Sequence, residues 1–396
     1  MLKEKFNEGS FNPWVKKVLM SADAMGGVWT YVLELSRGLR DYGVEVIVAT
    51  MGRRLSPQQR AVARKVTNLH VEEKSFKLEW MQEPWEDVRR AGMWLLELES
   101  MHSPDIVHLN GYAHGFLPFS APVIVVAHSC VYSWFSAVKG DRPPKIWRRY
   151  YRNVKRGLNA AGYLVAPSRA MLQEVQRYYG PLSHNRYSVL YNGYSLPGKI
   201  ESTQKEEIFV SAGRVWDEAK NMAFLDCISS KLKWPLYIAG DSIAPNGVSV
   251  TLGKSMYMGG ISHGSVLDLL NRASVYVSAA FYEPFGLSAL EAATCGCALV
   301  LPDIPSSREI WNNNALYASP NDPEKYCEIL NMVAEKPGLR KEMARRAQVH
   351  AAGFSSSKMA SDYMQLYSTM IANSDKFETF RDYGRGSEIK MGRLIA

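Results

Sequence analysis

Two glutamates in a loop-and-helix context are the strongest candidates for chemistry in this chain. Glu283 precedes Pro284, which disfavours helix at the residue before it, so we expect Glu283 in a loop. Gly286 opens a Leu- and Ala-rich segment that ends at Gly296, and this pattern predicts a short helix that carries Glu291. The N–H groups at the start of such a helix favour an anion. A phosphate-bearing ligand would then meet one carboxylate in the loop and another on the helix, whereas a helix cap and a solvated residue are the alternative.

A second group of residues suits phosphate binding. Arg214 and Lys220 follow a strand candidate, and a guanidinium and an ammonium at that point could clamp a diphosphate. Gly26 and Gly27 lie between the first strand candidate and a helix, an arrangement that brings backbone N–H groups against a phosphate. Solvated loop cations and an ordinary glycine turn are the alternatives at these positions.

The strands that must position these residues fall into two series separated by helical or turn segments, which predicts two parallel sheets with helices on both faces. The first series is Val15–Ala22, Val44–Thr50, Asn68–Glu73, Asp105–Asn110, Pro122–Ser129, Gly162–Ser168 and Tyr187–Asn192. The second series is Ile208–Gly213, Pro235–Gly240, Met256–Gly259, Ser274–Ala279, Ala298–Asp303 and Ala315–Ser319. Ligands bind beyond the carboxyl ends of parallel strands, so His128, Arg214 and Glu283 should meet in one cleft.

Length and composition agree with two globular domains. The 396 residues are 46% hydrophobic and 22% charged, which is enough for two full cores. No stretch of 18 uninterrupted apolar residues predicts a membrane span, and the N-terminus lacks the apolar core of a signal peptide. Five cysteines argue against a disulfide framework, so we expect a cytoplasmic protein. The net charge of +8 suits phosphates, anionic lipids or nucleic acid without distinguishing among them.

Residues 283–292, Glu-Pro-Phe-Gly-Leu-Ser-Ala-Leu-Glu-Ala, resemble the signature of retaining glycosyltransferases of the GT-B fold almost residue for residue. This family includes sucrose-phosphate synthases and bacterial α-mannosyl and α-glucosyl transferases, and the resemblance extends from Gly26 to about Tyr367. It implies an α/β fold of two Rossmann-like, doubly wound parallel-sheet domains that face each other across a cleft. We expect the first domain at 1–196, completed by a C-terminal helix at about 360–396, and the second at 197–359.

The resemblance also implies roles for individual residues. Arg214 and Lys220 would stabilise the departing diphosphate, although one residue more than expected separates them. Glu283 would hold donor sugar hydroxyls, Glu291 the ribose, and His128 a sugar hydroxyl near the reacting carbon. The residues implied in donor binding are Gly26, Gly27, Arg214, Lys220, Glu283, Phe285, Gly286, Leu287 and Glu291. Glu309 matches a further glutamate of the family pattern, with a structural role equally expected.

The reaction implied by the resemblance is transfer of a hexosyl unit from a UDP- or GDP-sugar, with no metal or cofactor. The acceptor would be a glycan, a lipid-linked saccharide or a small molecule, and no nucleic-acid partner is expected. The alternatives are a nucleotide-sugar epimerase of the same fold and a non-catalytic protein that binds nucleotides or polyanions.

A basic segment at 139–156 holds eight basic residues against one acid. Its apolar side chains lie at helical spacing, namely Trp147, Tyr150, Tyr151, Val154 and, just beyond, Leu158. A basic amphipathic helix can rest on an anionic membrane or hold an acidic acceptor, whereas a helix packed on the sheet with solvated charges is the alternative. We hypothesise that the segment contacts the acceptor or the inner face of its membrane. The aromatic stretch before it, Val131–Phe135, fits a sugar platform, an aglycone site or core packing.

Overall fold

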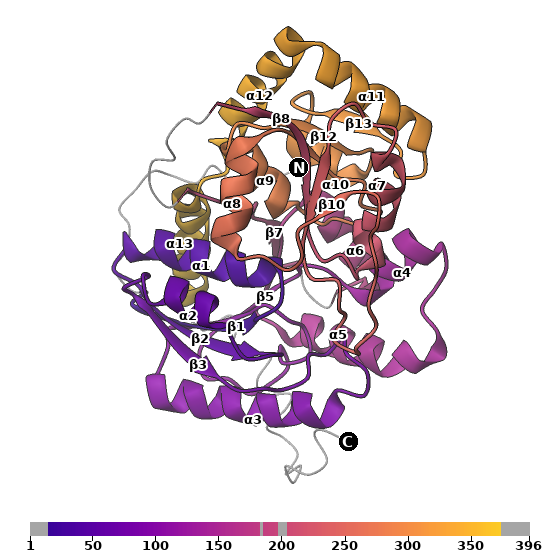
Figure 1. Cartoon of the computed structure of the whole chain (residues 1–396). Helices are drawn as coiled ribbons and strands as arrows, with labels where there is room; N and C mark the ends of the chain where they lie inside the picture. Colours follow the sequence, from indigo (N-terminus) through magenta and orange to yellow (C-terminus); the bar gives the residue numbers. More distant parts are fainter. Residues whose placement is uncertain (1–14, 183–184, 197–203, 374–396) are drawn as a thin grey trace.

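The computed structural model describes residues 15–182, 185–196 and 204–373. Two parallel sheets, each covered by helices on both faces, face each other with the N-terminal half on one side and the C-terminal half on the other (Figure 1). The predicted linker between the halves and the C-terminal tail beyond residue 373 lie mainly outside the described residues.

The first sheet has seven strands in the order β3-β2-β1-β4-β5-β6-β7, and all neighbours pair in parallel. The strands are β1 Lys17–Asp23, β2 Glu45–Met51, β3 Leu69–Glu73, β4 Ile106–Leu109, β5 Val123–Val126, β6 Tyr163–Ala166 and β7 Tyr187–Val189. The helices are α1 Gly27–Arg40, α2 Pro57–Ala63, α3 Trp85–His102, α4 Val131–Lys139, α5 Arg148–Ala160 and α6 Arg169–Tyr179, with a 3₁₀ turn η1 at Lys145–Trp147.

The second sheet has six strands in the order β10-β9-β8-β11-β12-β13, again all parallel. The strands are β8 Glu206–Ala212, β9 Leu236–Ala239, β10 Met256–Tyr257, β11 Ala273–Val277, β12 Ala298–Pro302 and β13 Leu316–Ala318. The helices are α7 Met222–Ser229, α8 His263–Arg272, α9 Leu287–Thr294, α10 Pro305–Trp311, α11 Pro323–Glu335 and α12 Pro337–Ala351, with a 3₁₀ turn η2 at Glu218–Lys220. Each strand candidate of both series coincides with one of these strands, so the predicted α/β fold is confirmed.

Both sheets are buried on both faces because their strands are nearly continuous apolar runs. In β1, Val18 and Met20 point into the core beneath α1, whereas Leu19 points into the core on the opposite face. The second sheet divides in the same way, with Val210 in one core and Phe209 in the other. Strands held from both sides fix the positions of the loops that follow them.

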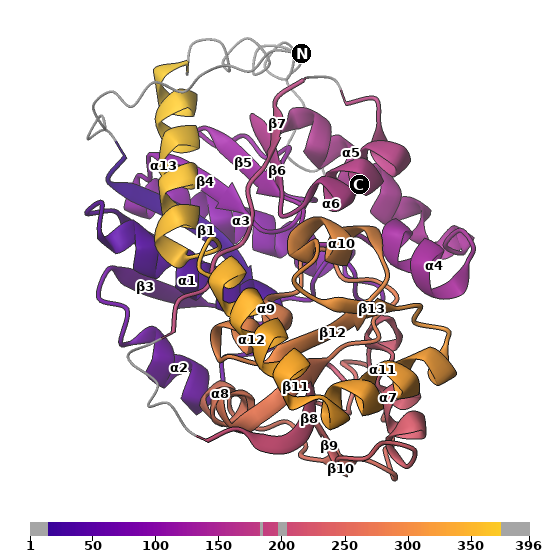
Figure 2. The ribbon, with the colours of Figure 1, turned by 90° about the horizontal axis from the view of Figure 1, so that it is seen from above.

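The last helix, α13 (Ser356–Ala372), follows the second domain in sequence but packs on the first. Figure 2 shows it alongside α1 and the first sheet. The approach of α13 to α1 is so close that a Cβ on Gly38 would lie 2.5 Å from the Ser356 carbonyl oxygen and 2.6 Å from the Ala360 Cβ. The chain therefore crosses between the domains twice, and the second crossing is secured by helix packing.

Candidate active site

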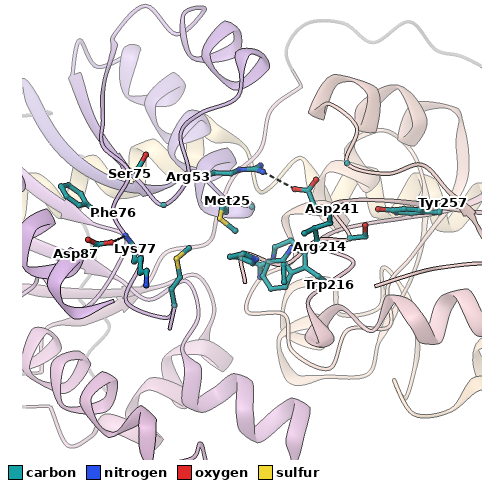
Figure 3. A pocket seen from close by; sticks show the side chains of 18 residues that line it. Met25, Arg53, Ser75, Phe76, Lys77, Asp87, Arg214, Trp216, Asp241 and Tyr257 are labelled. Atoms are coloured by element: carbon teal, nitrogen blue, oxygen red, sulfur yellow. Dashed lines mark hydrogen bonds and ion pairs between the residues drawn. The ribbon is translucent and has the colours of Figure 1, made fainter. Parts of the chain in front are cut away.

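A cavity of about 720 Å³ lies between the carboxyl ends of the two sheets. Its walls include Met25, Gly26 and Arg53 of the first domain and Arg214, Trp216 and Asp241 of the second (Figure 3). Arg53 and Asp241 form an ion pair across it, with 3.7 Å between nitrogen and oxygen. Parallel sheets bind ligands at this edge, so the cavity lies where a substrate of two facing sheets is expected.

The glycine turn after β1 faces the second domain directly. Gly26 caps α1 with φ of +89°, a conformation that side chains disfavour, and a Cβ there would lie 3.5 Å from Nη1 of Arg214. A Cβ on Gly27 would lie 3.6 Å from the side chain of Leu287, at the start of α9. The N-termini of α1 and α9 thus approach each other beside Arg214, which makes this part of the cleft suited to an anion.

Both predicted clamp cations are held by carboxylates. Arg214 donates to Asp217 Oδ2 at 2.6 Å, and Lys220 donates to Glu283 Oε2 at 2.5 Å. The additional residue between the two cations is accommodated because residues 218–220 wind into the tight turn η2. The two pairs are linked through the backbone, since the Lys220 N–H donates to the Asp217 carbonyl at 2.8 Å.

The loop that carries Glu283 is anchored from both domains. The Ser306 hydroxyl donates to the Glu283 carbonyl, and the Ser168 hydroxyl of the first domain donates to the Pro284 carbonyl at 2.6 Å. Phe285, predicted to bind the donor, has its side chain buried in the second-domain core. Gly286 adopts φ of +93° and begins α9.

Glu291 lies on α9, and 6% of its surface is exposed. His263, the first residue of α8, donates to its Oε1 at 2.8 Å. Partial burial lowers the pKa of His263, but the hydrogen bond with Glu291 and the charges of Glu291 and Glu34 more than offset this, so the pKa is raised. The sequence analysis missed His263, which is 28 residues away and carries no local signal.

His128 follows β5 and is held as a neutral imidazole. Burial lowers its pKa to about 3. Asn110 donates its amide N–H to the Ser21 carbonyl at 2.7 Å, so its oxygen accepts from His128 Nε2 at 2.7 Å. This assignment makes Nδ1 the acceptor nitrogen of the ring, and His128 lies outside the set of residues that line the cavity.

Asp23, the last residue of β1, is a site candidate that the sequence analysis missed. Its Oδ1 accepts from the Met25 N–H at 2.7 Å. Burial raises the pKa of Asp23 to about 7, even though the Met25 N–H and the charges of Arg214 and Arg53 lower it. A carboxyl group that titrates near neutrality beside the glycine turn can accept or release a proton. The sequence feature that could have identified Asp23 is an acidic residue at the carboxyl end of the first strand.

The Glu309 carboxylate makes its hydrogen bonds with the first domain. It accepts hydrogen bonds from the N–H groups of Arg169 and Ala170 at 2.7 and 2.9 Å, and from the Tyr191 hydroxyl at 3.0 Å. The carboxylate therefore caps α6 of the first domain from α10 of the second.

The basic segment packs its apolar stripe inward. Tyr150, Val154 and Leu158 are buried in the core beneath α5, while the exposed cations are Lys139, Arg142, Lys145, Arg148, Arg149, Arg152 and Arg156. This arrangement agrees with the alternative in which the helix packs on the sheet and its charges are solvated. In residues 15–182, 185–196 and 204–373, no helix is both long and apolar enough to cross a bilayer.

Comparisons with known proteins agree with this arrangement. Residues 25–196 match the family model described as Glycosyltransferase Family 4, and residues 249–350 match the one described as Glycosyl transferases group 1. The chain belongs to the family 4-like glycosyltransferases of the GT-B fold. The two models cover the regions on either side of the cleft.

Two relatives of this glycosyltransferase are curated enzymes. One is the N,N'-diacetylbacillosaminyl-diphospho-undecaprenol alpha-1,3-N-acetylgalactosaminyltransferase of Campylobacter jejuni, 28% identical over 31% of this chain and 32% of the relative. The other is the O-antigen chain mannosyltransferase RfbU of Salmonella typhimurium, 22% identical over 48% of this chain and 57% of the relative. The matches thus span between a third and about three fifths of these relatives.

Among solved structures, the sucrose-phosphate synthase of Thermosynechococcus elongatus is similar with a TM-score of 0.69. The match covers 90% of this chain and 99% of that one at 16% identity. Such a likeness shows the two-domain fold.

Proposed function

We propose that this glycosyltransferase moves a hexosyl unit from a nucleoside-diphosphate sugar to an acceptor, with retention at the anomeric carbon and without a metal ion. The observation that carries the proposal is the convergence of Arg214 and Lys220 with the facing N-termini of α1 and α9. Two fixed cations and two helix ends suit a diphosphate, and they supply positive charge where the leaving group becomes negative. Each such donor contributes about 3 to 4 kcal/mol to lowering the barrier.

The groups beyond the clamp suit the remaining parts of such a donor. Glu291 is a nearly buried carboxylate, able to accept hydrogen bonds from the two hydroxyls of a ribose. His128 offers a neutral acceptor to a sugar hydroxyl. In this proposal Glu283 shares its carboxylate between Lys220 and the hydroxyls of the transferred sugar, and its contact with Lys220 supports this role.

In the reaction that we propose, the acceptor oxygen bonds to the anomeric carbon on the face that the diphosphate leaves. The bond between that carbon and the diphosphate oxygen breaks, and a diphosphate oxygen takes the proton of the acceptor hydroxyl. Arg214 and Lys220 hold the diphosphate during this exchange, so their charges lower the barrier without either residue forming a covalent bond.

For the acceptor we propose a saccharide, free or linked to a lipid. The names of the two curated relatives support this, since one acts on a diphospho-undecaprenol-linked saccharide and the other on an O-antigen chain. The exposed cations of 142–152 would offer a surface to an anionic acceptor or membrane mainly through charge, because most of the apolar stripe packs on the core, although Ile146 among them is 65% exposed.

Isothermal titration of the metal-free protein with UDP, GDP and ADP tests the proposal. We expect one nucleotide to bind tightly and Glu291→Ala to weaken that binding. The sugar forms of that nucleotide are then screened for transfer, with release of the nucleoside diphosphate and the anomeric configuration of the product as readouts. Absence of binding by all three nucleotides would overturn the proposal.

The same screen separates the two alternatives. An epimerase would convert the donor without a separate acceptor, and a non-catalytic protein would bind the nucleotide without releasing sugar. The charged clamp around the leaving diphosphate favours transfer.

A further inference from the structure

Helix α4 of the first domain reaches across to the phosphate clamp of the second. It begins three residues after His128. Trp134 lies on this helix, and its indole Nε1–H donates to Asp217 Oδ1 at 3.0 Å. One turn further on, Lys139 pairs with Glu218 Oε2 at 2.5 Å. The helix therefore contacts η2, the turn that also carries Lys220.

Asp217 connects the two domains through separate oxygens. Its Oδ1 accepts from Trp134 and from the Ala219 N–H at 3.1 Å, whereas its Oδ2 accepts from Arg214 at 2.6 Å. Only 6% of the residue is exposed, so each lost partner would leave a buried carboxylate oxygen incompletely satisfied. The same carboxylate thus orients the guanidinium and is itself held by the opposite domain.

Burial by itself raises the pKa of Asp217, but the charges of Arg214 and Lys220 lower it below its usual value. The hydrogen bonds from Trp134 and Ala219 act in the same direction. The side chain is consequently an anion near neutral pH, and an anion can fix an arginine by a charge-assisted hydrogen bond.

We propose that Asp217 is a positioning residue for the Arg214 guanidinium, and that Trp134 makes this position depend on contact between α4 and the second domain. The clamp is then fully ordered only while the two domains are in contact. This inference rests on the proposed function, because it assumes that Arg214 binds a donor diphosphate. Helix α4 would then do more than pack against the second domain. It would link the position of the first domain, which carries His128, to the position of the Arg214 guanidinium.

The second bridge supplies a matched control. Lys139 and Glu218 join the same helix to the same turn, but this ion pair is exposed, with 43% and 60% of the side chains accessible. The Asp217 carboxylate bonds to Trp134, Ala219 and Arg214 and to neither member of the pair, although Lys139 Nζ lies 5.9 Å from the centroid of the Trp134 ring. If α4 only held the two domains together, loss of either bridge would weaken the binding of the nucleoside diphosphate and of the nucleoside to the same extent. If Asp217 positions Arg214, only the Trp134 bridge should affect phosphate binding.

The test compares wild type, Trp134→Phe and Lys139→Met by isothermal titration. The phenyl ring keeps an aromatic side chain at this position and removes the N–H donor, but it is smaller than the indole, so the nucleoside probe and the thermal unfolding report any loss of packing. The probes are whichever of UDP, GDP and ADP binds wild type most tightly, and the corresponding nucleoside, which lacks phosphates. We expect Trp134→Phe to bind the diphosphate about tenfold more weakly, which corresponds to about 1.4 kcal/mol. Nucleoside affinity should stay at the wild-type value, and Lys139→Met should match wild type with both probes.

Asp217→Asn provides the second measurement. Its amide oxygen can still accept from Trp134, but the charge that orients Arg214 is gone. We expect a similar loss with the diphosphate, and in the double variant with Trp134→Phe a loss smaller than the sum of the two. Thermal unfolding of each variant verifies that the fold is retained.

The outcomes separate the two proposals. Equal diphosphate binding by wild type and Trp134→Phe would overturn the positioning role and leave the proposed function intact. An equal loss for diphosphate and nucleoside would also overturn it, since the bridge would then serve only the packing of the domains. Absence of nucleotide binding by wild type would overturn the proposed function itself.

Discussion

The two walls of the cleft differ in how their polar groups are held. On the second domain, the groups are ions in pairs: Arg214 with Asp217 and Lys220 with Glu283. On the first domain, His128 is a neutral ring whose Nε2 is bonded to Asn110.

The neutral character continues behind the wall of the first domain. Burial lowers the pKa of His108 to about 3, and its two ring nitrogens lie 3.2 Å and 2.6 Å from the hydroxyls of Tyr31 and Tyr367. Tyr367 belongs to α13, so the last helix of the chain supports the wall that carries His128.

The difference suggests that the two domains contact different parts of the donor. Paired ions suit a diphosphate whose charge grows as the bond to the sugar breaks. Neutral hydrogen-bonding groups suit sugar hydroxyls, which require direction rather than charge. Asp23 and Arg53 are exceptions on the first wall, since the Asp23 carboxyl group has a pKa of about 7 and Arg53 pairs with Asp241 across the cavity.

The largest expected effect tests the charged wall. Arg214→Ala should lower kcat by about 10² to 10³, because it removes one donor to the developing negative charge. Arg308→Ala is a matched control, since Arg308 also pairs with an aspartate of the second domain but is exposed. Turnover assays with the nucleotide sugar identified by titration measure both variants, and equal rates would contradict the assignment of charge to this wall.

His128→Ala tests the neutral wall and should have a smaller effect. It leaves the Asn110 oxygen without its partner, at a cost of about 1 to 3 kcal/mol. We expect kcat/KM to fall by the same factor at pH 6 and pH 8, because the imidazole is neutral at both. A loss confined to one of these pH values would show that the ring acts as a titrating group.

Asp23→Asn tests the raised pKa of Asp23 through the pH dependence of the free energy of unfolding. The native carboxyl has a pKa of about 7, above its usual value near 3.9, so the native state binds a proton that the unfolded chain releases. Wild type should therefore lose stability relative to the variant as pH rises from about 4 to 7, and the difference should be constant above that range. Urea unfolding at pH 5 and pH 8 measures it, and a difference that does not change with pH would contradict the raised pKa.

The smallest effect is expected outside the cleft. Exchange of Arg142, Lys145 and Arg152 for glutamate should leave turnover on an uncharged, water-soluble acceptor unchanged, since these side chains are exposed. Sedimentation with anionic and neutral vesicles should show binding to the anionic ones alone, lost in the variant. Equal binding of wild type to both vesicles would remove the membrane from the proposal.

Much of the second domain could be predicted because its signals are local. The Pro284 and Gly286 punctuation placed Glu283 in a loop and Glu291 on a short helix, as the structure has them. Apolar runs bounded by turns similarly located every strand of both sheets. Such patterns depend on backbone preferences and burial within a few residues, which a sequence displays directly.

The partners of these residues were harder to predict from the sequence. Asp217 lies in the same loop as Arg214, yet its role depends on Trp134, which is 83 residues away. His263 meets Glu291 only because α8 and α9 lie side by side. The sequence likewise could not decide whether the aromatic stretch at 131–135 is core or site: Tyr132 and Phe135 pack in the core, whereas Trp134 reaches the opposite domain.

By itself, the sequence determined the strands, the two parallel sheets and the residue types at their carboxyl ends, because periodicity and turn chemistry are local. The tertiary structure alone decided which charges are paired, which imidazoles are neutral and which helix joins the two walls. Those properties depend on burial and on distances between side chains far apart in the chain, and both are set only when the two domains pack against each other.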